Sequence, residues 1–350
     1  MESTQHLRSR LTELREREPR LRSRDLAHRL GISEAELVSL DLGADVIRLG
    51  GDMKKIIKDV HRMGYVMALT RNEHVIHERK GVYDNITFYD GHGMGVAVNE
   101  DIDLRFFMND WAYCLAVIMR RKNGGDLHGL QFFDVYGRAV HKIYATPESK
   151  LDGWATIVDK YMTDQEPITI KNREAPRPPA EKPDAEIDVA AFREAWLGMT
   201  DTHQFFGMLK KYGVTRPQAL RLAPEGMVSP VDRMAVATML EQAAERQVSI
   251  MCFVPSPGCI QIHTGPVKNI RWMDKWLNVL DPKFNLHLDS SAIDRAFVVR
   301  KPTEDGIVTS LELFDAEGEL FTYFFGARKP GKPELTGWTE IAEGLTPVTV

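Results

Sequence analysis

The chain has 350 residues, of which 43% are hydrophobic, enough for two domains that each bury a core. Its 45 Lys and Arg against 50 Asp and Glu give a net charge of -5, which argues against general affinity for nucleic acid or anionic membranes. The N-terminus lacks a secretory signal pattern, no apolar run is long enough to span a bilayer, and the three cysteines form no CxxC pair. We therefore expect a cytoplasmic protein.

The helices predicted from hydrophobic periodicity occur twice in the same order. In each half, a helix that ends at a glycine is followed by a second, capped helix and then by a longer amphipathic helix. The predicted helices span residues 25–31, 32–37 and 52–63 in the first half, and residues 203–213, 214–220 and 231–246 in the second. The chain is thus predicted to be a duplication.

Short alternating segments follow the helices in each half. The corresponding pairs are 66–71 with 248–254, 75–77 with 260–263, 103–107 with 285–289, and 132–137 with 313–318. Turns of the Asp-x-x-Gly type join these segments, which favours antiparallel meanders over βαβ units. The predicted fold class is α+β, a tandem structural repeat in which each half is a large antiparallel β-sheet flanked by helices.

A charged stretch with four prolines and almost no large apolar residue separates the two halves. This composition predicts an exposed, partly extended linker over residues 171–188. The expected domains are an N-terminal repeat at 1–170 and a C-terminal repeat at 189–350.

Among the eleven histidines, His203 has the most suggestive setting. It is predicted to lie in the first turn of a helix, where the helix N-terminus disfavours the imidazolium and keeps the ring neutral, as metal ligation requires. Phe205 and Phe206 follow directly. A histidine beside two aromatic residues suits an apolar porphyrin face, and equally a helix that packs on a sheet.

Other motifs argue against common kinds of site. No zinc spacing or Gly-x-Ser-x-Gly elbow occurs, and the glycine-rich stretch Gly91–Gly95 lacks the following helix that a phosphate cradle needs, so we interpret it as a turn. Residues 24–37 have the form of a DNA-reading helix-turn-helix. Glu34 and Glu36 open its second helix and would be repelled by phosphate, so we expect DNA binding to be unlikely.

Several stretches together resemble the HemS/ShuS/ChuS/PhuS family of bacterial haem-utilisation proteins, also called hemin-degrading factors. The resemblance covers nearly the whole chain. Its most specific stretches are Arg71-Asn-Glu-His-Val-Ile-His-Glu, Asp103-Leu-Arg-Phe-Phe-Met-Asn, Gln131-Phe-Phe-Asp, Asp201-Thr-His-Gln-Phe-Phe and Arg300-Lys-Pro-Thr-Glu-Asp-Gly. The family fold, a tandem repeat of large antiparallel sheets flanked by helices, agrees with the duplication.

The resemblance implies one haem bound between the two repeats. His203 takes the place of the axial iron ligand, and Arg105 that of a distal, catalytic arginine from the other half. The implied propionate and pocket contacts are Arg216, Lys301, Phe325 and Arg328. At residues 325 and 327 this chain has Phe and Ala where relatives often have Tyr and Gln, so a pocket hydrogen bond is expected to be missing. His77 resembles a histidine considered a second haem contact in some members, although a role in supporting the fold is favoured.

Two functions follow from the resemblance. One is a haem-degrading, haem oxygenase-like enzyme of iron acquisition, and the other is a non-enzymatic carrier that delivers haem to a separate haem oxygenase. Expected partners are an inner-membrane haem importer and a haem oxygenase or reductase. Either a monomer or a homodimer is compatible with the sequence.

Overall fold

A computed structural model of the chain describes residues 4–19, 21–43, 45–121, 124–176, 180–329 and 331–348. It divides into two compact units. The N-terminal unit comprises Met1–Arg71, Glu78–Pro176 and Pro255–Gln261, and the C-terminal unit comprises Asn72–His77, Arg177–Val254 and Ile262–Val350. Among the described residues, no helix is both long and apolar enough to cross a membrane.

The elements occur in the same order in both halves of the chain. The first half contains α1 (Thr4–Arg17), α2 (Ser23–Leu30), α3 (Glu34–Ser39), β1 (Val46–Leu49), α4 (Met53–Asp59), η1 (Val60–Met63), β2 (Gly64–Arg71), β3 (Val75–Val82), β4 (Ile86–Tyr89), β5 (Met94–Val98), β6 (Asp103–Phe107), η2 (Met108–Asp110), β7 (Trp111–Met119), β8 (Leu127–Asp134), β9 (Ala139–Ser149) and α5 (Leu151–Tyr161). The second half contains η3 (Asp184–Glu186), α6 (Val189–Leu197), α7 (Gln204–Tyr212), α8 (Arg216–Leu222), β10 (Val228–Val231), α9 (Ala235–Glu245), β11 (Ile250–Ser256), β12 (Cys259–Gly265), β13 (Ile270–Met273), β14 (Trp276–Leu280), β15 (Phe284–Asp289), η4 (Ser290–Ala292), β16 (Arg295–Thr303), β17 (Gly306–Phe314), β18 (Leu320–Gly326) and α10 (Thr336–Glu343).

The strands form two nine-stranded sheets. Their orders are β1-β7-β8-β9-β2-β3-β15-β14-β13 and β10-β16-β17-β18-β11-β12-β6-β5-β4. Neighbours such as β8 and β9, or β17 and β18, pair antiparallel. Each order combines six strands of one half with three of the other. The α+β tandem repeat is confirmed, whereas this exchange of strands is a feature that the sequence analysis did not anticipate.

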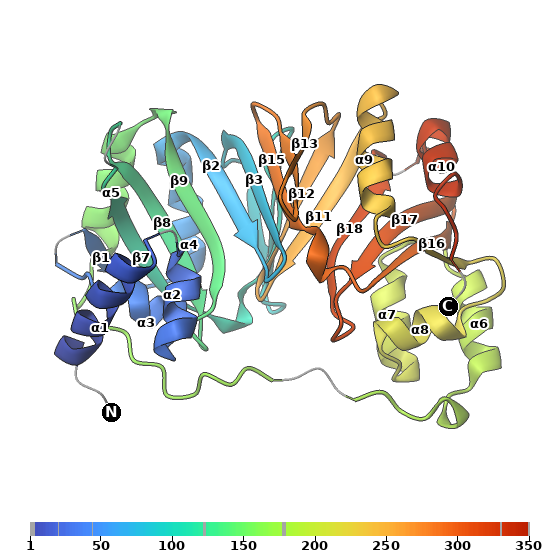
Figure 1. The fold of residues 1–350 in the computed structure, drawn as a ribbon, viewed down its shortest axis with the longest axis horizontal. Helices are drawn as coiled ribbons and strands as arrows, with labels where there is room; N and C mark the ends of the chain where they lie inside the picture. The colour runs from blue at the N-terminus through green and yellow to red at the C-terminus, as the bar shows by residue number, and fades with distance from the viewer. Residues whose placement is uncertain are drawn as a thin grey trace. The chain divides into compact units, whose positions relative to one another are not determined.

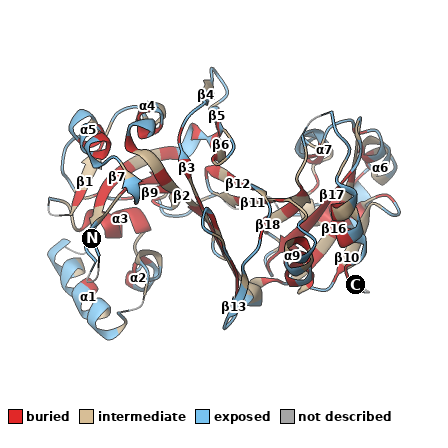
Figure 2. Cartoon of the chain, turned by 90° about the horizontal axis from the view of Figure 1, so that it is seen from above, coloured by how far each residue is buried: buried red, intermediate tan, exposed pale blue. Residues whose placement is uncertain are grey.

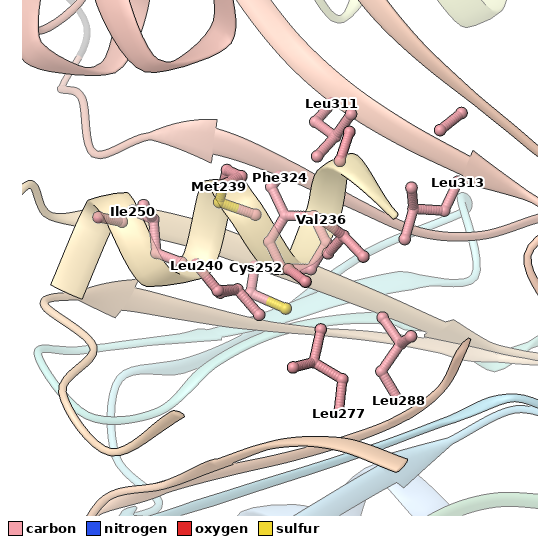
Figure 3. Packing of buried hydrophobic residues seen from close by; sticks show 14 of the residues in the cluster. Val236, Met239, Leu240, Ile250, Cys252, Leu277, Leu288, Leu311, Leu313 and Phe324 are labelled. Atoms are coloured by element: carbon pink, nitrogen blue, oxygen red, sulfur yellow. The ribbon is translucent and has the colours of Figure 1, made fainter. Parts of the chain in front are cut away.

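In the C-terminal unit, helices pack on both faces of the strands. Figure 1 shows α6, α7 and α8 on one side of β16 and β17, and α9 and α10 on the other. In the close view of Figure 3, Val236, Met239 and Leu240 of α9 face Cys252 and Phe324 of the sheet. Burying each large apolar side chain stabilises the unit by roughly 1.5–3 kcal/mol.

The N-terminal unit repeats this arrangement. Helices α4 and α5 cover one face of its strands, and α1, α2 and α3 cover the other. Figure 2 shows α3 buried along its length, whereas much of α1 is exposed. Helices α2 and α7 end in the same way, at Gly31 with φ 70° and Gly213 with φ 64°, a left-handed conformation that suits glycine.

Two predicted helices differ in detail from the structure. The segment predicted over 52–63 is α-helical only to Asp59 and ends as the 3-10 helix η1. In the segment predicted over 231–246, Val231 still belongs to β10 and the helix begins at Ala235. The expected turn at Gly91–Gly95 is confirmed only for Gly91–Gly93, which lie between the antiparallel strands β4 and β5, whereas Met94 and Gly95 already belong to β5.

The predicted linker contains the point where one unit gives way to the other, between Pro176 and Arg177. Residues 171–176 and 180–183 form neither helix nor strand, and η3 follows. Residues 177–179, with two of the four prolines, lie outside the described residues. The domain boundaries at 170 and 188 stay a prediction.

Candidate functional site

His203 lies at the start of α7, with an unusually exposed side chain. It is the N-cap residue of this helix, so it precedes the first turn in which the sequence analysis placed it. Its side chain is 93% exposed. The described part of the chain contains no cluster of three or more His, Cys, Asp or Glu that could hold a metal ion.

Asp201 fixes the orientation of the imidazole. One carboxylate oxygen, Oδ1, accepts the backbone N–H of His203 at 2.8 Å and lies 2.6 Å from its ring Nδ1. The backbone hydrogen bond lowers the pKa of Asp201, and the ring hydrogen bond adds to this effect against the opposing effect of burial. Since Oδ1 is an acceptor, Nδ1 carries the proton, which in a neutral imidazole places the lone pair on Nε2. This is the carboxylate–histidine arrangement that orients metal-binding histidines.

The two aromatic residues after His203 have different environments. Phe205 is buried, and its ring centroid lies 4.8 Å from that of Trp196 in an edge-on contact. Phe206, one turn from His203, is 75% exposed. Phe205 therefore matches the alternative interpretation, in which the helix packs on a sheet. Phe206 instead exposes its apolar ring one turn from His203.

Arg216 and Lys301 converge on one carboxylate beneath Phe205. Arg216 donates two hydrogen bonds to Glu312, from Nε at 2.8 Å and from a terminal nitrogen at 2.7 Å. Lys301 Nζ lies 2.7 Å from the same carboxylate and 3.2 Å from Ser310 Oγ. The Phe205 ring lies 5.1 Å from the Arg216 guanidinium and 4.8 Å from Lys301 Nζ. Two cations and one carboxylate leave this buried group with one positive charge.

Burial and mutual charge shift the pKa values in this group. Burial, against the opposing effect of Glu312 and with a contribution from the charge of Arg216, lowers the pKa of Lys301 to about 8. Burial alone would raise the pKa of Glu312, but Arg216 and Lys301 hold it well below its usual range. The carboxylate is therefore ionised at neutral pH.

Phe325 and Arg328 lie at the end of β18 and just after it. The Phe325 ring is 5.4 Å from Phe253 and 5.9 Å from Lys301 Nζ. Arg328 pairs with Asp305 at 3.2 Å, and its charge lowers the pKa of Asp201. Its Nε is buried and has no hydrogen-bond partner within the described ranges. The C-terminal unit thus contains five predicted site residues, in one group around Glu312 and another around Asp201.

Arg105 and His77 are not part of these groups. Arg105 lies on β6 in the N-terminal unit, pairs with Asp103, and has a side chain that is 33% exposed. His77 is fully buried, with its ring 4.9 Å from that of Phe284. This burial is compatible with a role of His77 in supporting the fold, which stays a prediction.

Sequence reasoning missed the acidic partners of the site. Glu312 alternates with Ser310 and Phe314 on one face of β17, so a carboxylate in a strand that is otherwise buried was a detectable signal. Asp201, two residues before the candidate ligand, was a second signal. Asp305 lies in a loop that gives no local indication of its pairing with Arg328.

The helix-turn-helix interpretation is incompatible with the burial of α3. All six of its residues are buried. Glu34 pairs with Lys142, and Glu36 bonds both Ser33 and Arg173, so neither carboxylate faces solvent as the sequence argument assumed. The helix has no exposed face to enter a groove, which is a stronger objection to DNA reading than charge repulsion.

Comparison with known proteins gives consistent matches. The family model described as "Haemin-degrading HemS.ChuX domain" matches residues 31–161 and 213–345. The hemin transport protein HmuS of Yersinia pestis is 37% identical over 322 residues, 91% of each chain. The hemin transport protein HemS of Yersinia enterocolitica is 36% identical over 324 residues, again 91% of each chain.

Two solved structures cover nearly the whole chain. Holo-PhuS, a heme-binding protein from Pseudomonas aeruginosa, has a TM-score of 0.95 and 43% identity, covering 99% of this chain and 100% of that one. The heme degrading enzyme ChuS of Escherichia coli O157:H7 has a TM-score of 0.90 and 34% identity with the same coverage. The two matched segments, the duplicated fold and these relatives show that the chain belongs to the haemin-degrading HemS/ChuX domain family.

Proposed function

We propose that this chain binds one haem, as cargo or substrate of bacterial haem uptake, through Nε2 of His203. The observation that carries the proposal is the His203–Asp201 pair, which leaves an exposed nitrogen lone pair suited to iron. The exposed ring of Phe206 next to it suits an apolar macrocycle. Relatives described as hemin transport and heme-binding proteins support the same ligand.

The cations of the C-terminal unit suit the two propionates of haem. Arg328, with its buried Nε and its nearness to Asp201, is the stronger candidate for a direct contact. Arg216 and Lys301 already share Glu312, so we infer that they act through the single positive charge of their group and through their contacts with the ring of Phe205 in α7. Phe325 would add an apolar contact without a hydrogen bond.

We infer that Arg105 acts on the distal side of the haem, as the family resemblance implies. Its guanidinium stays charged at any physiological pH and can donate hydrogen bonds to a ligand of the iron. Its strand β6 belongs to the same nine-stranded sheet as β16, β17 and β18 in the strand order.

We propose oxidative degradation of haem as the activity, because Arg105 supplies a fixed charge where oxygen would be activated by the bound iron. One relative, ChuS of Escherichia coli, is described both as a heme degrading enzyme and as a heme oxygenase, which favours this function. Carriage of haem is the second candidate, favoured by the 93% exposure of His203, which leaves the ligand open to transfer. We place either activity in the cytoplasm, where three buried, unpaired cysteines are compatible with reducing conditions, with a haem importer and an oxygenase or reductase as partners.

The experiment that tests haem binding is titration of His203→Ala with haem. Loss of the iron ligand should change the Soret band and weaken affinity by at least about tenfold, since loss of a residue that only orients a metal ligand already costs that much. His61→Ala, an exposed histidine of the N-terminal unit, is the matched control and should behave as the wild type. An unchanged spectrum and affinity of His203→Ala would contradict the assignment.

A second experiment separates degradation from carriage. The haem-loaded chain is incubated with ascorbate and catalase, and the products are identified by absorption spectra and mass spectrometry. Degradation predicts loss of the Soret band with an opened tetrapyrrole and released iron. Haem that stays intact, and passes to an added oxygenase, would assign carriage instead.

A further inference from the structure

The duplication gives the molecule two equivalent faces. One lies under α2 and α3 in the N-terminal unit, and the other lies under α7 and α8 in the C-terminal unit. On both faces the first helix ends at a glycine, Gly31 or Gly213, and a hydroxyl side chain, Ser33 or Thr215, caps the second. A feature that only one face has is therefore a candidate for the particular function of that face.

The two faces differ in how the chain enters the first helix. The N-cap residue of α2, Arg22, is extended, with φ -81° and ψ 161°. The N-cap residue of α7 is His203, which has the helical values φ -67° and ψ -22°. A compact turn leads into α7, because the backbone N–H of Gln204 donates to the carbonyl oxygen of Asp201 at 3.1 Å. The candidate iron ligand is therefore part of this turn.

The side chain of Gln204 closes the turn on Thr200. Its Oε1 accepts the backbone N–H of Thr200 at 2.9 Å, and its Nε2 lies 3.0 Å from Thr200 Oγ1, to which it donates. A backbone N–H can only donate, so the carboxamide oxygen must face it, and this fixes the orientation of the amide. The two hydrogen bonds join the first and last residues of the segment 200–204.

Thr200 is itself attached to the sheet. Its carbonyl oxygen accepts the backbone N–H of Glu304 at 3.0 Å, in the turn between β16 and β17. The preceding residue, Met199, is buried in the core. Thr200 is therefore held by the sheet and the core, and the hydrogen bonds of Gln204 connect the turn to both.

The Asp201–His203 pair lies inside the closed segment. The side chains of Asp201 and His203 are 57% and 93% exposed, so packing does not fix their orientation. Their orientation depends on the hydrogen bonds between them and on the backbone that carries both residues. Since Gln204 ties the two ends of that backbone segment together, it limits the directions in which the imidazole Nε2 can point.

We propose that Gln204 is a positioning residue for His203. It keeps the segment 200–204 closed, so that the carboxylate of Asp201 stays on Nδ1 and Nε2 points in one direction. Gln204 does not bind the iron, and it acts through Asp201. This inference rests on the proposed function, in which His203 binds haem iron.

The first test uses the full chain without haem, with isotopically labelled histidine. Nitrogen NMR of the wild type should show that the His203 ring prefers the Nδ1–H form, and His203→Ala assigns the signal. Gln204→Leu removes both hydrogen bonds to Thr200 and should cause loss of this preference. Gln204→Glu should keep it, because a carboxylate accepts from both the N–H and the hydroxyl of Thr200.

The control for the NMR test is Gln5→Leu, which replaces an exposed glutamine of α1 and should match the wild type. Thr200→Val removes only the hydroxyl partner of Gln204, so it should shift the tautomer preference in the same direction as Gln204→Leu, by a smaller amount. An Nδ1–H preference that is absent from the wild type, or unchanged in both Gln204→Leu and Thr200→Val, would overturn the proposal. Thr200→Val alone decides if Gln204→Leu does not fold.

The second test is a double-mutant cycle on haem affinity. Gln204→Leu should raise the haem dissociation constant by about tenfold, the lower end of the range for loss of a residue that orients a metal ligand. In an Asp201→Asn background the same substitution should change it by less than about twofold, because the residue through which Gln204 acts is already altered. Equal losses in both backgrounds would show that Gln204 only stabilises α7, which contradicts the proposal.

The two tests separate this inference from the proposed function. If His203→Ala binds haem as the wild type does, the assignment of the iron ligand fails. The NMR measurement needs no haem, so it still decides whether Gln204 orients the imidazole.

Discussion

The two equivalent faces show how a duplicated fold can keep a scaffold and change its ligand chemistry. The C-terminal face has His203 ten residues before the cap of α7, and the N-terminal face has Leu21 ten residues before the cap of α2. Only the first offers an imidazole. Aromatic rings accompany His203, whereas arginines accompany Leu21. The two faces thus differ at the positions that we propose to face a ligand.

The buried ion pair is the feature that both faces share. Each face places a buried carboxylate against a cation between a short helix and the sheet, but the strand partners are not equivalent, because Glu312 corresponds to Gln131 and Lys142 to Tyr323. A buried pair is costly to break, because removal of one partner leaves an uncompensated charge. The pair therefore anchors the helices that carry the ligand-facing residues, and its removal should have the largest effect on stability.

Glu312→Gln should be the most destabilising substitution that we consider. It leaves Arg216 and Lys301 buried without their carboxylate, which should lower the free energy of unfolding by about 3–5 kcal/mol. Urea unfolding followed by circular dichroism measures the change. Glu317→Gln, an exposed glutamate nearby, is the control and should have little effect. A loss below about 1 kcal/mol would show that the pair does not anchor the face.

Lys301 should make stability depend on pH. Its pKa in the folded state, about 8, is below its unfolded value, so the unfolded chain binds more protons between about pH 8 and pH 10.5. Stability from this group therefore rises with pH in that window. Relative to Lys301→Met, the wild type should gain up to about 3 kcal/mol of unfolding free energy from pH 8 to 10.5. Parallel pH profiles for the two proteins would contradict the shift.

Asp201→Asn should weaken the iron ligand without removing it. The amide keeps the shape of the side chain but loses the charge that orients the Nδ1–H of His203. Haem affinity should fall by about tenfold, and the iron–histidine stretching frequency in resonance Raman spectra should decrease. In the protein without haem, nitrogen NMR should show loss of the preference for the Nδ1–H form. Unchanged NMR and Raman signals would exclude this positioning role.

Arg105→Ala should have the smallest effect on affinity. The His203 ligand and the cationic contacts remain, so the dissociation constant should change by less than about threefold. Loss of the distal charge should instead shift the pH at which water bound to the ferric haem iron ionises, which changes the haem spectrum. It should also slow any degradation. If neither the spectrum nor turnover changes, the distal role of Arg105 is wrong.

The sequence predicted what depends on local pattern. Glycine caps at Gly31 and Gly213, alternating strands and repeated order were sufficient for the α+β duplication. The exchange of three strands between the halves could not be predicted, because alternation indicates which face of a strand is buried but not which strand lies beside it. The burial of charged residues could not be predicted either. Glu34 and Glu36 are buried because they pair with Lys142 and Arg173, which are distant in the sequence.

Haem stoichiometry tests most directly the claim that the two faces have diverged. Haem is titrated into the wild type, His203→Ala and the Arg24→Gln/Arg71→Gln double variant, and the Soret difference spectrum is followed to saturation. We predict one equivalent per chain for the wild type and the double variant, with the ligand signature lost in His203→Ala. Two equivalents in the wild type, or an unchanged single equivalent in His203→Ala together with loss in the double variant, would contradict the account.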